Sequence, residues 1–119
     1  MLKVRREQME TFRAQRQARF VQRMVDHLRV TFPTQTKNLT DDHLRETVQQ
    51  GERKAHDYGI VYEDDIRRFL GYVVVYGLTL DSHPQTQWIA DILHRHDIDG
   101  TVKMDFLDDY ELRVTKDQR

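Results

Sequence analysis

The chain has 119 residues, of which 38% are hydrophobic and 33% are charged, and these values predict one soluble globular domain with a modest core. The absence of cysteine excludes disulfides, thiolate metal sites and cysteine nucleophiles. No apolar stretch at the start has signal-peptide length, and none elsewhere reaches the roughly 20 residues that span a bilayer, so we expect a cytoplasmic protein.

The net charge of −1 conceals an uneven distribution along the chain. Residues 1–32 contain eight basic and three acidic side chains, giving +5, and the rest contain 11 basic and 17 acidic side chains, giving −6. The sequence therefore predicts a basic first helix on or beside an acidic body. Charge complementarity within the chain is the simpler explanation, and we rank it above a dedicated partner surface.

Apolar residues recur at helical spacing between residues 20 and 32, which predicts a first helix over about 8–31 that ends at Pro33. Upstream this stripe thins, so residues 1–18 are expected to form an arm that projects beyond the core, with Met9 and Phe12 as an apolar handle. Arginines follow the side of the helix opposite the stripe. The predicted partner-binding residues are Met9, Phe12, Arg13, Arg16, Arg19 and Arg23.

Thr40 is the expected N-cap of the second helix, because its hydroxyl can accept a hydrogen bond from a free amide of the first turn. Gly51 and Ala55 leave one face of that helix small, which indicates close approach of another helix. Gly59 is expected to close it in the left-handed conformation. Residues 34–38, which lie before this second helix, are expected to be loose.

The third helix is expected over residues 63–76, with three acidic residues in its first turn and Gly77 at its end. Its three adjacent valines would also fit a strand, but no second strand is available to pair with it. Because it is apolar nearly all round, we place it at the centre of the bundle.

A fourth helix is expected to be capped by Asp81 or Ser82, with Pro84 near its first position and Trp88 on its buried face. A last helix is expected over about 102–116. The predicted fold is all-α: residues 1–119 form a single compact bundle of about five helices, with a long, partly projecting N-terminal helix and a loose tail over 115–119.

Residues 95–106 imitate a calcium-binding loop, since Asp97, Asp99 and Gly100 occupy matching positions. Arg95 and Phe106 stand where that loop needs carboxylates, so we interpret the segment as a turn between helices.

His94 and His96 beside these aspartates could offer ligands to a transition metal, but no third ligand is identifiable. We treat them as turn histidines. Ser82 is the only serine and lacks the sequence context of a hydrolase nucleophile. We therefore expect no catalytic residues, no metal and no cofactor, and a protein that is not an enzyme.

Several short motifs in fixed order resemble a small all-helical bacterial family whose genes lie beside those for type VI secretion spike proteins and effectors. They are Arg19-Phe20-Val21, Phe32-Pro33, Tyr58-Gly59-Ile60, Glu63-x-Asp65-Ile66, Tyr76-Gly77, Leu80-Asp81, Pro84 and Trp88. The resemblance covers residues 19–104. It implies an accessory protein that handles an effector, a spike protein or a loading chaperone, and it implies no catalytic residues.

Our leading interpretation is a non-enzymatic adaptor or co-chaperone of a type VI secretion system. One alternative is an immunity protein that covers a basic toxin with an acidic surface around residues 63–65. A second alternative is a nucleic-acid-binding protein that uses Arg16, Arg19 and Arg23, which the acidic remainder and the pI of about 6.6 disfavour. A homo-oligomer stays open, and no membrane is expected among the partners.

Overall fold

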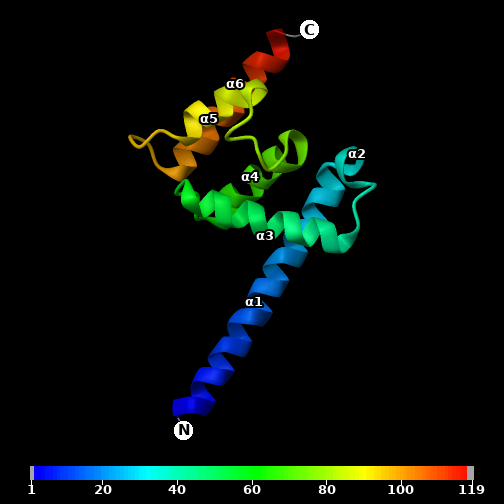
Figure 1. Ribbon diagram of the computed structural model, residues 1–119, viewed down its shortest axis with the longest axis vertical. Coiled ribbons are helices and arrows are strands. Elements are labelled where there is room, and N and C mark those ends of the chain that lie inside the picture. Colours follow the sequence, from blue (N-terminus) through cyan, green and yellow to red (C-terminus); the bar gives the residue numbers. More distant parts are fainter. Residues whose placement is uncertain (1, 118–119) are drawn as a thin grey trace. The chain divides into compact units, whose positions relative to one another are not determined.

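The computed structural model describes the backbone of residues 2–117 and the side chains of residues 6–114, and in this part of the chain all regular structure is helical. The expected all-α fold with a long N-terminal helix is confirmed. The elements are α1 (Leu2–Thr31), α2 (Pro33–Thr36), α3 (Asp41–Asp57), α4 (Glu63–Tyr76), the 3-10 helix η1 (Pro84–Thr86), α5 (Gln87–Leu93) and α6 (Gly100–Asp117) (Figure 1).

The chain divides into two compact units, residues 1–48 and 49–119, with the boundary inside α3. The single domain expected from the sequence stays a prediction. None of the helices in the described part is both long enough and apolar enough to cross a membrane.

In the first unit, α1 is longer than predicted, because it begins at Leu2 and not near Gln8. It ends at Thr31, before Pro33, as the sequence indicated. Its buried apolar residues all lie between positions 20 and 28, whereas residues 6–19 are exposed without exception. The thinning of the apolar stripe therefore correctly marked where burial of this helix stops.

The segment after α1 is more ordered than expected. Residues 34–38 were predicted to be loose, but residues 33–36 form the short helix α2, in which Thr36 is buried. Arg29 holds this segment, since its guanidinium donates to the carbonyl oxygens of Thr36 at 2.9 Å and Leu39 at 2.8 Å. A cation donating to carbonyls at a helix C-terminus satisfies groups that the helix cannot bond internally.

The predicted ends of α3 and α4 are confirmed. The hydroxyl of Thr40 accepts a hydrogen bond from the His43 amide at 3.1 Å, which caps α3. Gly59 and Gly77 have φ angles of 78° and 94°, so each supplies the left-handed residue that closes a helix.

In the second unit, α3 approaches α4 closely at Gly51, where an added Cβ would lie 2.5 Å from Cδ2 of Leu70. The close approach that the sequence indicated for this face is therefore present at Gly51. We expected α4 to be buried nearly all round, but Val75 is exposed. An even closer approach occurs at Gly100, where an added Cβ would lie 2.2 Å from the backbone oxygen of Gly59.

The expected cap of the fourth helix is wrong. The ring of His83 caps η1 by accepting a hydrogen bond from the Gln85 amide at 3.1 Å, whereas Asp81 binds other side chains and Ser82 donates to Thr79 O. Pro84 is at the first position of η1, as predicted. The last helix extends over residues 100–117, so residues 115–117 belong to it and not to a loose tail, and residues 118–119 lie outside the described residues.

Candidate protein-interaction surface on helix α1

All six predicted partner-binding residues lie on α1 and are exposed. Phe12, Arg16, Arg19 and Arg23 follow one another at intervals of four, three and four residues, which places them on one side of a helix with 3.6 residues per turn. Met9 and Arg13 border the same side. We call these residues the arginine face: Met9, Phe12, Arg13, Arg16, Arg19 and Arg23.

Two large apolar side chains of the arginine face are open to solvent, because Met9 is 53% exposed and Phe12 is 60% exposed. Single exposed apolar residues are ordinary, but these two adjoin on one face of the helix. The guanidinium carbon of Arg16 lies 5.7 Å from the centroid of the Phe12 ring. This cation–π contact keeps the aromatic and cationic groups together.

Three of the four arginines of this face, Arg13, Arg16 and Arg19, have no ion-pair partner among the described side chains. Glu7 and Glu10, the acidic residues of this half of α1, fall on another side of the helix by their spacing. The face is therefore a cationic strip with two apolar residues at its N-terminal end.

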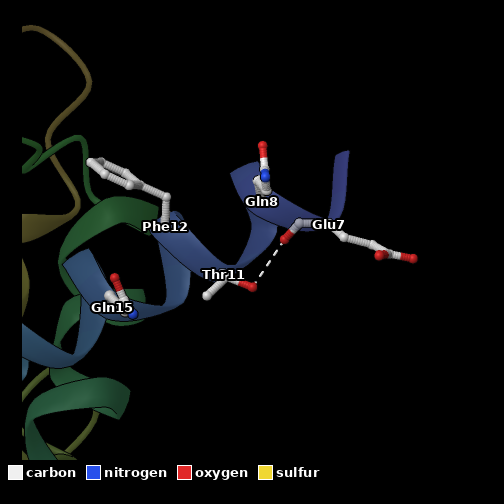
Figure 2. A pocket seen from close by; sticks show the side chains of 5 residues that line it. All are labelled: Glu7, Gln8, Thr11, Phe12 and Gln15. Atoms are coloured by element: carbon white, nitrogen blue, oxygen red, sulfur yellow. Dashed lines mark hydrogen bonds between the residues drawn. The ribbon is translucent and has the colours of Figure 1, made fainter. Parts of the chain in front are cut away.

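Two shallow depressions lie on this half of α1, and Phe12 lines both. One of about 290 Å³ lies among Glu7, Gln8, Thr11, Phe12 and Gln15 (Figure 2). The other, of about 260 Å³, lies among Gln8, Met9, Phe12, Arg13 and Arg16. All lining residues belong to one helix, so these are crevices between neighbouring side chains. Such crevices can receive the side chains of a partner but cannot enclose a small molecule.

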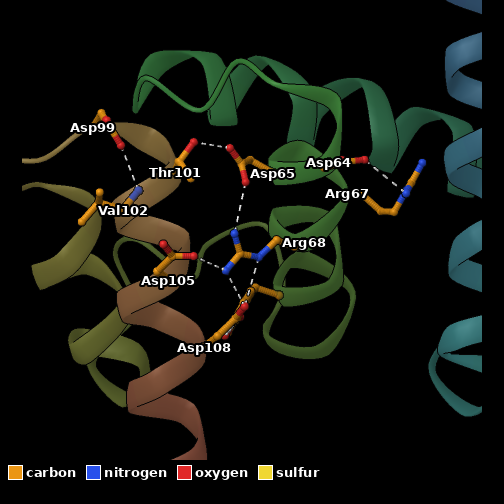
Figure 3. Close-up of polar contacts among 10 residues, drawn as sticks. Asp64, Asp65, Arg67, Arg68, Asp99, Thr101, Val102, Asp105 and Asp108 are labelled. Atoms are coloured by element: carbon orange, nitrogen blue, oxygen red, sulfur yellow. Dashed lines mark hydrogen bonds and ion pairs between the residues drawn. The ribbon is translucent and has the colours of Figure 1, made fainter.

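The segment that imitates a calcium loop has other contacts. Arg95 binds both carboxylate oxygens of Asp97, at 3.0 and 2.6 Å, and this hydrogen bonding lowers the pKa of Asp97. Asp99 accepts from the Val102 amide at 2.9 Å and caps α6 (Figure 3). Within the described residues no three His, Asp or Glu side chains are grouped so that they could hold a metal ion.

Sequence reasoning missed a polar cluster around Tyr58 in the second unit. The Tyr58 hydroxyl donates to Asp81, and Lys54 Nζ lies 2.7 Å from the other Asp81 oxygen. Nε2 of His94 lies 3.3 Å from the same hydroxyl. Burial alone would raise the pKa of Asp81, but hydrogen bonds from Lys54 and Tyr58 lower it below its usual range. The cluster ties α3 to the α4–η1 connection, and the sequence carried no spacing signal for it.

A second cluster surrounds Arg68 on α4 (Figure 3). Its guanidinium binds Asp108 at 2.7 Å, Asp105 at 2.9 Å and Asp65 at 3.1 Å. The other oxygen of Asp65 accepts from Thr101, so both oxygens of this carboxylate are engaged. Asp65 is buried, and the acidic surface expected around residues 63–65 is correspondingly reduced.

No protein-family model, curated protein or solved structure matches this chain. The association with type VI secretion is therefore a prediction from the short sequence motifs alone.

Proposed function

We propose that this chain is a non-enzymatic protein-binding module that docks a partner through the arginine face of α1. The observation that carries the proposal is the continuous exposure of residues 6–19, in which Met9 and Phe12 stand among arginines without ion pairs in the described side chains. A helix that extends its amphipathic face into solvent is a common form of the helix-in-groove mode of recognition.

The arginine face specifies the chemistry of the partner. Phe12 and Met9 fit an apolar groove, because an exposed aromatic ring gains most of its binding free energy when a pocket desolvates it. Arg13, Arg16 and Arg19 fit carboxylates at the rim of that groove, where opposite charges set orientation and raise the association rate. The partner is thus an acidic protein with an apolar groove wide enough for one helix.

The resemblance to proteins encoded with type VI secretion genes suggests the biological setting. We propose an adaptor or co-chaperone that works in the cytoplasm and presents an effector to a spike protein or to its loading chaperone. An immunity protein remains the alternative function, but Asp65 is buried against Arg68 and Thr101, so less acidic surface is available to cover a basic toxin.

The test is photo-cross-linking in cells that contain the secretion genes. A photoreactive phenylalanine analogue at position 12 is expected to cross-link one acidic partner, which mass spectrometry identifies. Position 30 is the matched control, since Val30 is 81% exposed on the same side of α1 but lies about five turns beyond Phe12, past the end of the arginine face. Cross-linking at both positions alike, or to nucleic acid, would contradict the proposal.

Recombinant partner and protein then give the affinity. Phe12→Asp combined with Arg16→Glu is expected to weaken binding by at least about 30-fold, because it removes the apolar anchor and reverses a rim charge. Val30→Asp is expected to leave affinity within about twofold. Added salt should weaken wild-type binding, since exposed charge pairs are screened.

A further inference from the structure

Four aromatic rings in the second unit form a continuous cluster that extends from its core to its surface. Tyr72, at the inner end, is buried. The centroid of the Tyr72 ring lies 6.4 Å from that of Trp88. The Trp88 ring stacks on Tyr110, with centroids 5.2 Å apart and an interplanar angle of 16°. Tyr76 meets Trp88 edge to face at 5.8 Å. Because α4, α5 and α6 each contribute, the rings are held in fixed positions.

The outer end of this cluster is open. Tyr110 is 43% exposed, and Tyr76 and Trp88 are half-buried. Within the described side chains, neither the Tyr110 hydroxyl nor the Trp88 indole N–H bonds to another residue. Tyrosine and tryptophan with a rigid apolar body and a free polar tip are enriched at protein interfaces.

The carboxylate of Glu111 borders the same rings. It accepts a hydrogen bond from Tyr76 at 2.9 Å, but it forms no ion pair within the described side chains. Asp108 and Asp109, its neighbours on α6, bind Arg68 and Arg113 respectively. Burial and the adjoining Glu111 raise the pKa of Tyr76 to about 12. Unlike Asp108 and Asp109, Glu111 places a negative charge without an ion pair in the described side chains beside the aromatic cluster.

The chain itself shows which group suits such a surface. Phe106 lies on α6 one turn before Tyr110, and its ring is exposed. The guanidinium carbon of Arg95 lies 5.4 Å from the centroid of this ring. An arginine from another molecule could take the equivalent position over Tyr110. Arginine fits better than lysine, because its planar guanidinium stacks on a ring and donates to a carboxylate at the same time.

We propose that Tyr76, Trp88, Tyr110 and Glu111 form a second docking surface, the aromatic–acidic face, which binds an arginine-bearing segment of a partner protein. Its chemistry is opposite to that of the arginine face, so the two surfaces select different partners. This gives an adaptor the two sites it needs to join one protein to another. The inference uses only the second unit and does not depend on the function proposed for α1.

The full-length protein is tested with a defined probe. The probe is an acetylated 12-residue alanine peptide with arginine at every fourth position, and the control peptide has glutamate at those positions. Trp88 is the only tryptophan, so its fluorescence reports directly on this face. We expect a saturable fluorescence change with the arginine peptide and none with the glutamate peptide. Calorimetry measures the affinity independently of the fluorescence.

Two variants assign the response to this face. Glu111→Gln keeps an acceptor for the Tyr76 hydroxyl but removes the charge, and Tyr110→Ala removes the outer ring. Each variant is expected to bind the arginine peptide at least about fivefold more weakly than the wild type. The matched control is Asp109→Asn, which removes the same charge from the same helix where Arg113 already neutralises it. Its affinity should stay within about twofold of the wild type.

Four results would overturn the inference. Three come from the peptide titrations: the lack of saturable binding at millimolar peptide, equal affinity of both main variants and the wild type, and equal binding of the glutamate peptide. Sedimentation of the protein alone gives the fourth. A self-associating protein whose dimer is broken by Tyr110→Ala would show that a second copy covers this face. Melting temperatures within a few degrees of the wild type confirm that each variant is folded.

Discussion

The guanidinium of Arg68 on α4 binds one oxygen of Asp108 on α6 twice, from Nε at 3.0 Å and from Nη2 at 2.7 Å. The other oxygen of Asp108 accepts from the Tyr72 hydroxyl at 2.7 Å. Burial by itself would lower the pKa of Arg68, but hydrogen bonds to Asp108 and Asp105 raise it. The arginine therefore stays charged at any pH at which the fold survives, and it is a permanent link between α4 and α6.

We predict that Arg68→Met costs about 2 kcal/mol of unfolding free energy, because it leaves carboxylates of α4 and α6 facing one another without their cation. This figure lies below that for a fully buried pair, since the Arg68 side chain is 31% exposed. Urea denaturation measures the change. Arg67→Met is the matched control, because the Arg67 ion pairs with Glu63 and Asp64 are 3.5 Å long. It should cost under about 1 kcal/mol, and equal losses in both variants would contradict the assignment.

Gly100→Ala is predicted to be more disruptive than Gly51→Ala. At Gly100 the new methyl group would meet the backbone oxygen of Gly59 at 2.2 Å, and backbone cannot turn aside. At Gly51 it would meet the end of the Leu70 side chain, which can change rotamer. We expect a loss of about 3 kcal/mol for Gly100→Ala and about 1 kcal/mol for Gly51→Ala, measured by thermal unfolding. The reverse order would show that the turn at Gly59 moves easily.

The helices could be predicted from the sequence because local signals mark them. The acidic first turn and the closing glycine bounded α4 at the residues where the structure has it, 63 and 76, and the hydroxyl of Thr40 capped α3 as expected. The α2 helix was missed because residues 33–36 are polar, and what orders them is Arg29, a residue of the preceding helix. Local patterns do not carry such contacts.

The shared side and the exposure of the arginine-face residues could be predicted because these residues lie on one helix and follow its period, and their binding role stays a prediction. The clusters around Tyr58 and Arg68 could not, because Tyr58 and Asp81, or Arg68 and Asp108, become neighbours only when the second unit packs. Trp88 was expected on the buried face of its helix, yet its ring is half-buried and stacks on the exposed Tyr110. The aromatic–acidic face thus emerged only from the fold.

Asp81 gives the protein a predictable acid response. Its folded-state pKa is lowered, so its ionised form stabilises the fold above the ordinary carboxyl pKa of 3.8. That contribution is lost as pH falls below 3.8 and through the lowered folded-state value. Asp81→Asn should therefore be less stable than the wild type at pH 7, and the difference should shrink as pH falls below about 4. Denaturation at a series of pH values measures this, and a difference independent of pH would contradict it.

Arg29 is predicted to order the connection between α1 and α3. Besides the two carbonyls, it binds the Asp41 carboxylate at 2.6 Å. Arg29→Ala should speed amide hydrogen exchange in residues 33–41 by at least about tenfold, because about 1.4 kcal/mol of local stabilisation corresponds to that factor. Exchange in α4 and α6 serves as the internal reference. Uniform acceleration in every helix would indicate that Arg29 acts on global stability.

Mutations in the two halves of α1 should differ in their effect on stability. Phe12→Asp changes a side chain that is 60% exposed, so we expect the melting temperature to stay within about 2 °C of the wild type. Leu28→Ala removes a fully buried side chain from the same helix and should cost about 3 kcal/mol. Calorimetric unfolding compares them. Equal stability of Phe12→Asp and the wild type, together with loss of partner binding, is what a docking residue requires. A large loss of stability in Phe12→Asp would instead make Phe12 part of the core and remove it from the arginine face.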